Sequence, residues 1–258
     1  MQFSIEVTPN TSLVRLPSAV RDISITFLPG ADDRDIVAQA ARIQSLGYQP
    51  IPHIPARSIR DRAHLDSFLT RLRDTVDLKK VLVIGGSRDA IGSYTSTLQL
   101  FDTGLFEGLQ VGIAGHPEGM PHLNEDECDA VLYAKNQYAK ATGLQLFIVT
   151  QWTMQPQTVI QWLDRIQSFN TLPICLGIPG PASVQTLMKF AAICGVRASL
   201  TGLKYQSGKL GQLLMAQTPD AIVDALQHRV DHFHLYTFGG VKRTAAWISD
   251  RTCSSLSA

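Results

Sequence analysis

Residues 81–87 read Val-Leu-Val-Ile-Gly-Gly-Ser, an apolar run that ends on two glycines and a hydroxyl residue. Seven other short apolar runs end in a similar way, on a polar or glycine residue that leads into the next loop: FSIEV near Glu6, ISITF around Thr26, PIPH at His53, VGIAG before His116, LFIVT before Gln151, LPICLGI before Pro179 and HFHLYTF before Gly239. Short apolar runs with such boundaries are typical of strands that are buried on both faces.

Segments of helical character separate these predicted strands. Carboxylates at Asp32–Asp35 mark a helix start, apolar residues recur at helical spacing, and Gly47 ends the segment. The same pattern predicts helices over 58–76, 124–141, 155–169 and 183–194, with one or two more within 196–229, including 219–228. Parallel strands need crossovers that helices supply, so eight such units predict an α/β protein, a (β/α)8 TIM barrel. We expect one domain over residues 1–250 and a small, polar, frayed tail at 251–258.

The composition argues against several classes of partner. Charged residues make up 17% of the chain and the formal net charge is +1, so neither nucleic acid nor an anionic membrane surface is expected. No run has the roughly 18 apolar residues of a membrane span, and the first residues lack the basic segment of a secretion signal. The scattered cysteines show no CxxC and no metal-ligand spacing, which favours reduced thiols, a cytoplasmic protein and no bound metal: Cys128, Cys175, Cys194 and Cys253.

Barrels of this kind carry their chemistry at the carboxyl ends of the strands, where three titratable residues fall. Glu6 lies in an apolar strand, and a buried carboxylate is costly unless it is paired or used. We expect burial to raise its pKa toward the range of a general acid, with a structural ion pair to an arginine as the alternative. His53 and His116 end strands three and five. Each alone is commonly a packing residue, but two on one face favour a ligand site.

Other polar groups at this end are candidates for binding. Gln151 next to Trp152 offers a donor and an acceptor beside an aromatic ring, which suits a flat heterocycle; capping of a loop is the alternative. The segment 84–87 lacks a complete GxGxxG or GxxxxGK[ST] pattern, so its two glycines indicate close approach of a backbone or ligand rather than a nucleotide-binding loop. Lys140, late in the helix after strand five, could neutralise a phosphate or be a solvated helix lysine.

Together these residues resemble the catalytic domain of methylenetetrahydrofolate reductases over nearly the whole chain. The matching segments occur in the order of that family: Ser4-Ile5-Glu6 with Pro9, Ser24-Ile25-Thr26, Pro52-His53, Gly86, Tyr94-Thr95-Ser96, Pro117-Glu118, Lys140-Ala141 with Gly143, Thr150-Gln151, Gly177-Ile178-Pro179 and His234-Leu235-Tyr236-Thr237. Each segment is weak by itself, and the ordered set on a predicted barrel is more specific.

The resemblance implies a flavoenzyme that passes a hydride from NADH or NADPH through FAD to 5,10-methylenetetrahydrofolate, giving 5-methyltetrahydrofolate. Glu6 would then be the acid that protonates the folate, and Gln151, with Trp152 and Ser87, would contact this substrate. The residues implied to line the FAD site are Thr26, His53, Gly86, Ser87, Tyr94, Ala114, His116 and Lys140.

The chain departs from this family at the turn after strand four. Gly85-Gly86-Ser87 stands where the family usually has Arg-Gly-Asp, so an arginine and an aspartate are missing. Two alternatives therefore stay open: a flavin-independent relative that acts on one-carbon tetrahydrofolates, and a folate-binding subunit without catalysis. A homo-oligomer or a protein partner also stays open.

Overall fold

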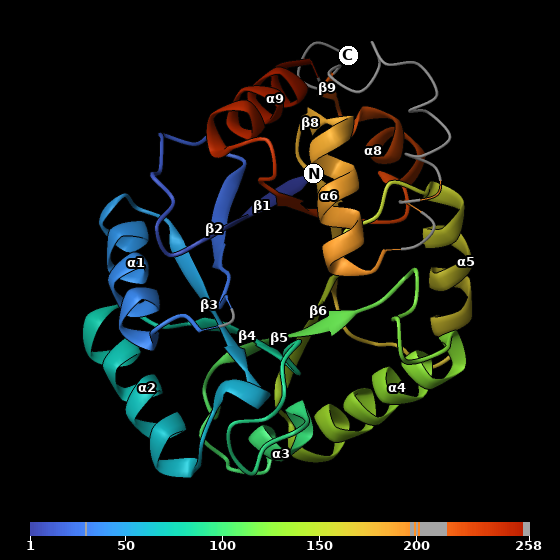
Figure 1. Ribbon diagram of the computed structural model, residues 1–258. Coiled ribbons are helices and arrows are strands. Elements are labelled where there is room, and N and C mark those ends of the chain that lie inside the picture. Colours follow the sequence, from blue (N-terminus) through green and yellow to red (C-terminus); the bar gives the residue numbers. More distant parts are fainter. Residues whose placement is uncertain (29, 197–198, 200, 202–215, 255–258) are drawn as a thin grey trace.

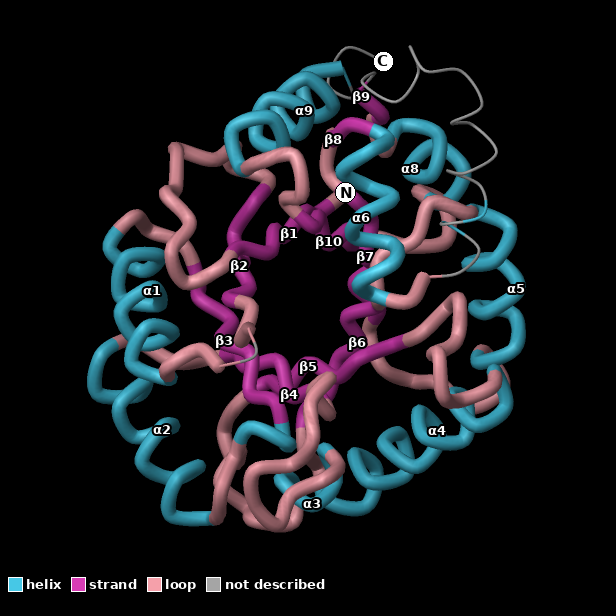
Figure 2. The backbone as a smooth tube through the Cα atoms, viewed as in Figure 1, coloured by secondary structure: helices cyan, strands magenta, loops and turns pink. Residues whose placement is uncertain are grey.

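The computed structural model describes residues 1–28, 30–196, 199, 201 and 216–254. Eight parallel strands form a closed barrel in which each strand pairs with its neighbours in chain order, and β1 pairs with β10 to close the ring (Figures 1 and 2). The barrel strands are β1 (Gln2–Val7), β2 (Val20–Ile25), β3 (Gln49–Pro55), β4 (Lys80–Ile84), β5 (Gln110–Gly115), β6 (Gln145–Thr150), β7 (Ile174–Pro179) and β10 (His232–Tyr236). The predicted (β/α)8 barrel is confirmed.

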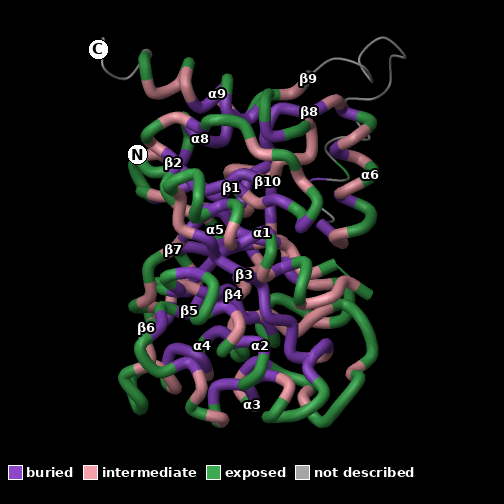
Figure 3. Tube along the Cα trace, turned by 90° about the vertical axis from the view of Figure 1, so that its left-hand side faces the viewer, coloured by how far each residue is buried: buried purple, intermediate pink, exposed green. Residues whose placement is uncertain are grey.

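The helices lie outside this ring, except for α6, which extends over its carboxyl end (Figures 2 and 3). They are α1 (Asp33–Ser45), α2 (Arg62–Thr75), α3 (Thr97–Phe101), α4 (Glu125–Thr142), α5 (Pro156–Ile166), α6 (Val184–Cys194), α8 (Asp220–Leu226) and α9 (Val241–Ser254), with a 3-10 turn at Ala56–Ser58. A two-stranded antiparallel sheet joins β8 (Ala182–Ser183) to β9 (Ala216–Gln217). Figure 3 shows that buried positions follow the strands and the inner faces of the helices.

Local signals explain most helix boundaries. Asn124 and Glu127 form a capping box at the start of α4, and Gly143 ends that helix in the left-handed conformation. The helix expected from residue 58 begins instead at Arg62, because the Asp61 side chain caps it by accepting from the His64 amide. The expected frayed tail is wrong for residues 251–254, which continue α9. Residues 255–258 lie outside the described residues.

The remaining expectations concern the long segment before the last strand. A helix within 219–228 is confirmed by α8, whereas most of 197–215 lies outside the described residues. The short α3 was not predicted, because five residues are too few to show helical periodicity.

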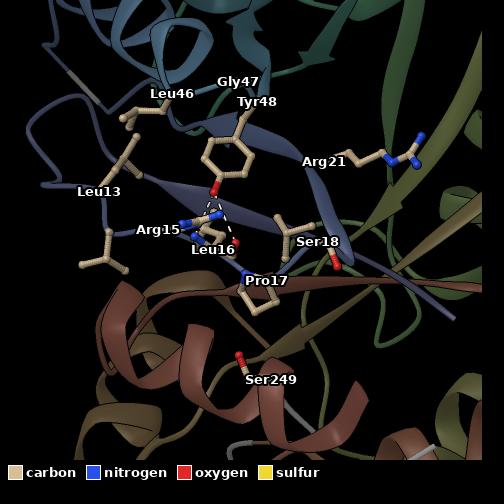
Figure 4. Close-up of a pocket in the computed structure, with 12 residues that line it drawn as sticks. Leu13, Arg15, Leu16, Pro17, Ser18, Arg21, Leu46, Gly47, Tyr48 and Ser249 are labelled. Carbon is tan, nitrogen blue, oxygen red and sulfur yellow. Dashed lines mark hydrogen bonds between the residues drawn. The ribbon is translucent and has the colours of Figure 1, made fainter. Parts of the chain in front are cut away.

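The connection from β1 to β2 contains no helix, and this leaves a groove on the outside of the barrel. Residues 8–19 run as an irregular segment between α9 and α1, and Tyr48 fixes it by accepting from the Leu16 amide at 2.8 Å. The groove beside it has a volume of about 1000 Å³ and is lined in part by Arg15, Arg21 and Ser249 (Figure 4). It lies toward the amino-terminal ends of β2 and β3, away from the carboxyl ends where chemistry is expected.

The interior of the barrel has an apolar half and a polar half. Side chains of β3, β4, β6 and β7 pack together inside the ring, and this apolar set is Ile51, Leu82, Val149 and Cys175. Strands β1, β2 and β10 instead bury polar side chains: Ser4, Ser24 and His234. Because side chains alternate along a strand, the next inward positions on β1 and β10 toward the carboxyl end are Glu6 and Tyr236. Within the described part of the chain, no helix is both long and apolar enough to cross a membrane.

Candidate active site at the carboxyl end of the barrel

Glu6 is the centre of the polar half of the barrel. Thr26, at the end of β2, donates its hydroxyl to Glu6 Oε1 at 2.8 Å. The Nε2 atoms of His53 and His234 each lie 3.5 Å from Glu6 Oε2. The alternative of an arginine ion pair is wrong for the described residues, since the ion-pair partners found for Glu6 are these two imidazoles. The Glu6 side chain keeps 14% of its surface exposed, so a ligand at the barrel mouth can reach it.

The pKa of Glu6 shifts in the direction opposite to the one expected from burial alone. Burial does raise the pKa of this carboxyl, but the electrostatic effect of the imidazoles of His53 and His234 and the hydrogen bonds from His234 and Thr26 together outweigh it. The net pKa is below the ordinary value of 4.5. The expectation of a raised pKa was therefore wrong: Glu6 is a carboxylate at neutral pH and has to take up a proton before it can act as an acid.

His53 is a neutral imidazole with unused hydrogen-bonding capacity. The residue is 4% exposed, and neither ring nitrogen has a hydrogen-bond partner among the described residues, although Nε2 lies 3.5 Å from Glu6 Oε2. Burial lowers the pKa of His53, the negative charge of Glu6 opposes this, and the neighbouring His234 lowers it further. Two unpartnered nitrogens on a buried ring are rare in native proteins, and they favour a ligand contact at this position.

Two residues of β10, His234 and Tyr236, complete the surroundings of Glu6. Both lie in a segment that resembles the reductase family, but the sequence predicts no role for either. His234 Nδ1 lies 2.8 Å from Ser4 Oγ, while Tyr236 donates its hydroxyl to the Thr150 carbonyl at 3.1 Å. Burial and then the charge of Glu6 raise the pKa of Tyr236 well above 10, so the phenol stays protonated. Alternation in His-Phe-His-Leu-Tyr was the available signal, because it puts both residues on the inner face once the strand is assigned.

Gln151 lies across from Glu6, just after β6. Its side-chain amide donates to the Cys194 carbonyl at the end of α6, at 2.7 Å. Its Oε1 atom is buried and has no hydrogen-bond partner among the residues that the structure describes. The charge of Glu6 also contributes, after burial, to the raised pKa of the Cys194 thiol. The end of α6 therefore lies close to both residues, and Gln151 holds a free acceptor that a ligand N–H could use.

Trp152 is placed differently from a residue that stacks on a ligand at the surface. The residue is 0% exposed and packs in a small cluster with Ala182, Val184 and Leu187 beneath α6. Its ring meets Phe238 edge-on, with centroids 5.3 Å apart. Its indole supports α6, and α6 in turn carries the Cys194 carbonyl that holds Gln151.

The turn after β4 brings Gly86 and Ser87 to the rim of the mouth. Gly86 has a φ of 91°, a conformation that strongly favours glycine, and an added Cβ would lie 3.2 Å from Pro55 Cβ. Arg57 donates to the Gly86 carbonyl at 3.2 Å, and Ser87 is exposed. Tyr94, in the following loop, is partly buried and packs against the main core. The expected close approach of another backbone segment is found at Gly86, where Pro55 of β3 and the following Arg57 lie near, and not at Gly85, which has nothing within 4 Å of an added Cβ.

Near β5, the structure does not bring together His116 and Lys140, which the resemblance assigns to one FAD site. His116 follows β5, and burial, with a smaller effect of Lys135, lowers its pKa to about 4. Lys135 is buried on α4, and its burial lowers the ammonium pKa to about 8. Lys140 is exposed in the last turn of the same helix, shortly before β6 begins at the opposite end of the barrel. Lys140 is thus not brought together with the other predicted residues.

The predicted residues on the barrel strands share one end of the barrel, although His116 lines a small pocket there with Cys128 and Leu132 of α4 and Trp162 of α5. Glu6, Thr26, His53, Ala114, His116 and Gln151 all lie at or just beyond the carboxyl ends of their strands. Within the described ranges, no cluster of three or more His, Cys, Asp or Glu side chains is arranged to bind a metal ion. This mouth can donate and accept protons at Glu6 and its imidazoles, and it can bind a heterocycle through His53 and Gln151.

No protein-family model matches the sequence. Among solved structures, dihydropteroate synthase (FolP) from Thermus thermophilus is similar over 90% of this chain and 82% of its own, with 12% identity and a TM-score of 0.44. A likeness at this level carries no information on the reaction of this chain. The barrel class rests on the strand topology itself.

Proposed function

We propose that this barrel interconverts 5,10-methylenetetrahydrofolate and 5-methyltetrahydrofolate by hydride transfer through FAD, with NADH or NADPH as the other substrate. The observation that carries the proposal is the position of Glu6. It is a partly exposed carboxylate near the carboxyl end of β1, 3.5 Å from the Nε2 atoms of His53 and His234, and His234 is hydrogen-bonded to it and can exchange a proton with it.

Opening the five-membered ring of the methylene compound requires a proton on the nitrogen that leaves the bridging carbon. The C–N bond breaks, its electron pair stays on that nitrogen, and the cation left on the carbon and the other nitrogen accepts a hydride. Glu6, once protonated, would supply that proton, and the adjacent imidazoles would help to restore it. Gln151 would hold the pterin through its free Oε1, because the pterin ring carries N–H donors and Oε1 has no partner within the described protein.

Only some of the residues implied to line an FAD site lie together on one side of the barrel mouth. His53, with two unpartnered nitrogens, offers buried contacts, and Thr26, Gly86, Ala114 and His116 lie on neighbouring strand ends. Bound there, the flavin would supply two-electron transfer between nicotinamide and folate. Lys140 is too far along α4 to share such a site, and Ser87 contributes no charge. These two observations favour a second candidate, a flavin-independent relative that acts on the same folates.

An absorbance spectrum of the purified protein between about 350 and 500 nm, followed by an anaerobic turnover assay, tests the proposal. We expect a flavin spectrum and oxidation of NADH or NADPH that depends on methylenetetrahydrofolate. Glu6→Gln should abolish folate turnover and leave nicotinamide oxidation by an artificial acceptor intact. A colourless protein with folate turnover would support the second candidate, and folate binding without turnover would make the chain a binding subunit.

A further inference from the structure

A line of polar side chains crosses the barrel from Glu6 toward the amino-terminal face. His234 Nε2 lies 3.5 Å from Glu6 Oε2, and His234 Nδ1 lies 2.8 Å from Ser4 Oγ. His232 Nε2 lies 2.9 Å from the same Ser4 oxygen. Ser4 and His234 are directly opposed in the pairing of β1 with β10, and His232 is one inward position nearer the amino-terminal end. Ser4 and His234 are almost completely buried, so bulk water does not bridge this line.

The hydrogen bonds along this line can all point the same way. Glu6 is a carboxylate and accepts, so the proton of a neutral His234 is on Nε2, and His234 Nδ1 accepts. Ser4 has one hydroxyl proton and donates it to His234 Nδ1, which leaves Ser4 Oγ to accept from His232 Nε2. One arrangement of protons therefore satisfies every contact and directs the chain toward Glu6.

The far end of the line reaches partly exposed, charged groups. His232 is half-buried at the start of β10. Burial, and to a smaller extent His234, lowers its pKa to about 4; of the weaker effects, Asp22 raises this pKa and Lys80 lowers it. Asp22 and Lys80 form an ion pair at 2.7 Å beside it. From β7, Cys175 faces the same pair, and burial raises its thiol pKa to about 12, so it is neutral. His232 is thus a neutral imidazole between the buried line and the amino-terminal face.

We propose that His232, Ser4 and His234 form a proton path that connects Glu6 with solvent at the amino-terminal face of the barrel. The inference rests on the proposed function, because it serves an acid at the mouth. A proton added to His232 Nδ1 displaces the Nε2 proton to Ser4, the Ser4 proton moves to His234 Nδ1, and the His234 Nε2 proton moves to Glu6. For each proton that enters at His232, one proton reaches Glu6. A folate that covers the mouth then does not cut Glu6 off from water.

Ser4→Ala tests the path, since it removes only the central hydroxyl. We expect the folate half-reaction to slow by about tenfold or more, with nicotinamide oxidation by an artificial acceptor unchanged. Ser24→Ala is the matched control, because Ser24 is an equally buried serine on the adjacent strand that takes no part in the line. Ser4→Thr keeps a hydroxyl and should restore the rate, and His232→Gln should slow the reaction as Ser4→Ala does.

Folate turnover at the wild-type rate in Ser4→Ala, or in His232→Gln, would overturn the path. Nitrogen NMR of histidine-labelled wild-type protein gives a readout that needs no activity. We expect His232 and His234 both to carry their proton on Nε2, and a neutral His234 with its proton on Nδ1 would refute the proposed direction. If the wild type shows these tautomers but turns over no folate, the proposed function fails while the hydrogen-bonded line stands.

Discussion

Replacing Gln151 by alanine separates a ligand-binding role from a structural one, because two effects on stability oppose each other. The variant loses the hydrogen bond from Gln151 to the Cys194 carbonyl, which costs about 0.5–1.5 kcal/mol. It also removes Oε1, a buried acceptor without a partner in the described part of the chain, whose burial costs about 1–3 kcal/mol in the free protein. We therefore expect the free energy of unfolding to change by less than about 1 kcal/mol.

Folate binding should respond much more strongly to the same change. If a pterin N–H fills the free Oε1 acceptor, its loss leaves a ligand donor unpaired and costs about 1–3 kcal/mol. This corresponds to a Kd about 5- to 150-fold higher. The measurements are urea denaturation followed by tryptophan fluorescence and isothermal titration calorimetry with 5-methyltetrahydrofolate.

Gln39 provides a matched control at a buried glutamine far from the mouth. Its amide donates to the Thr11 carbonyl at 2.9 Å, and its oxygen accepts from Arg42 at 3.5 Å. Gln39→Ala loses both contacts and, unlike Gln151→Ala, removes no buried unpaired acceptor, so it should destabilise the protein by about 1–3 kcal/mol. It should leave folate affinity unchanged. A Gln151→Ala protein that behaves like this control would refute the binding role.

Three further variants, one of them with a matched control, test other parts of the site and the barrel. The lowered pKa of Glu6 contributes stability that is present above its ordinary value of 4.5 and is lost as the pH falls through the folded-state pKa. The difference in unfolding free energy between wild type and Glu6→Gln should therefore shrink on acidification, and a difference that grows would contradict the pKa direction. An added Cβ at Gly177 would lie 2.2 Å from the Thr150 carbonyl, so Gly177→Ala should cost about 1–3 kcal/mol or more in thermal unfolding. Gly85→Ala, with nothing within 4 Å, should be tolerated, and equal effects at both positions would count against this packing. Trp152→Ala should cost about 3–5 kcal/mol in urea denaturation because it empties a fully buried site beneath α6, whereas a loss below about 1 kcal/mol would show that the indole does not support this helix.

The positions of Glu6, His53 and Gln151 at one end of the barrel could be predicted from the sequence. Each follows or ends an apolar run, and parallel strands joined by helical crossovers bring all their carboxyl ends to one face. Neither the burial of these residues nor their hydrogen-bond partners follows from strand order. Trp152 shows the limit: its place next to Gln151 in sequence suggested a shared ligand, but neighbouring residues of an extended chain point to opposite sides.

The basic group near β5 shows a second limit of the sequence. The ordered motif implies a role for Lys140, while the structure buries Lys135 next to His116 and leaves Lys140 exposed at the far end of α4. A helix advances about 1.5 Å per residue, so the five positions between the two lysines move the ammonium well along the barrel. No local sequence pattern shows how far a residue on a helix lies from the carboxyl end of the barrel.

By itself, the sequence determined the barrel class, the strand ends that hold polar groups and most of the helix caps. These features depend on neighbours within a few residues, through apolar periodicity, capping side chains and glycine turns. Only the tertiary structure decided the chemistry of Glu6 and the line through Ser4. Closure of the ring pairs β1 with β10 and places Ser4 beside His234, 230 residues later in the chain. The same closure brings His234 to Glu6, and its effect, together with those of His53 and Thr26 from two further strands, reverses the pKa shift that burial alone would give Glu6.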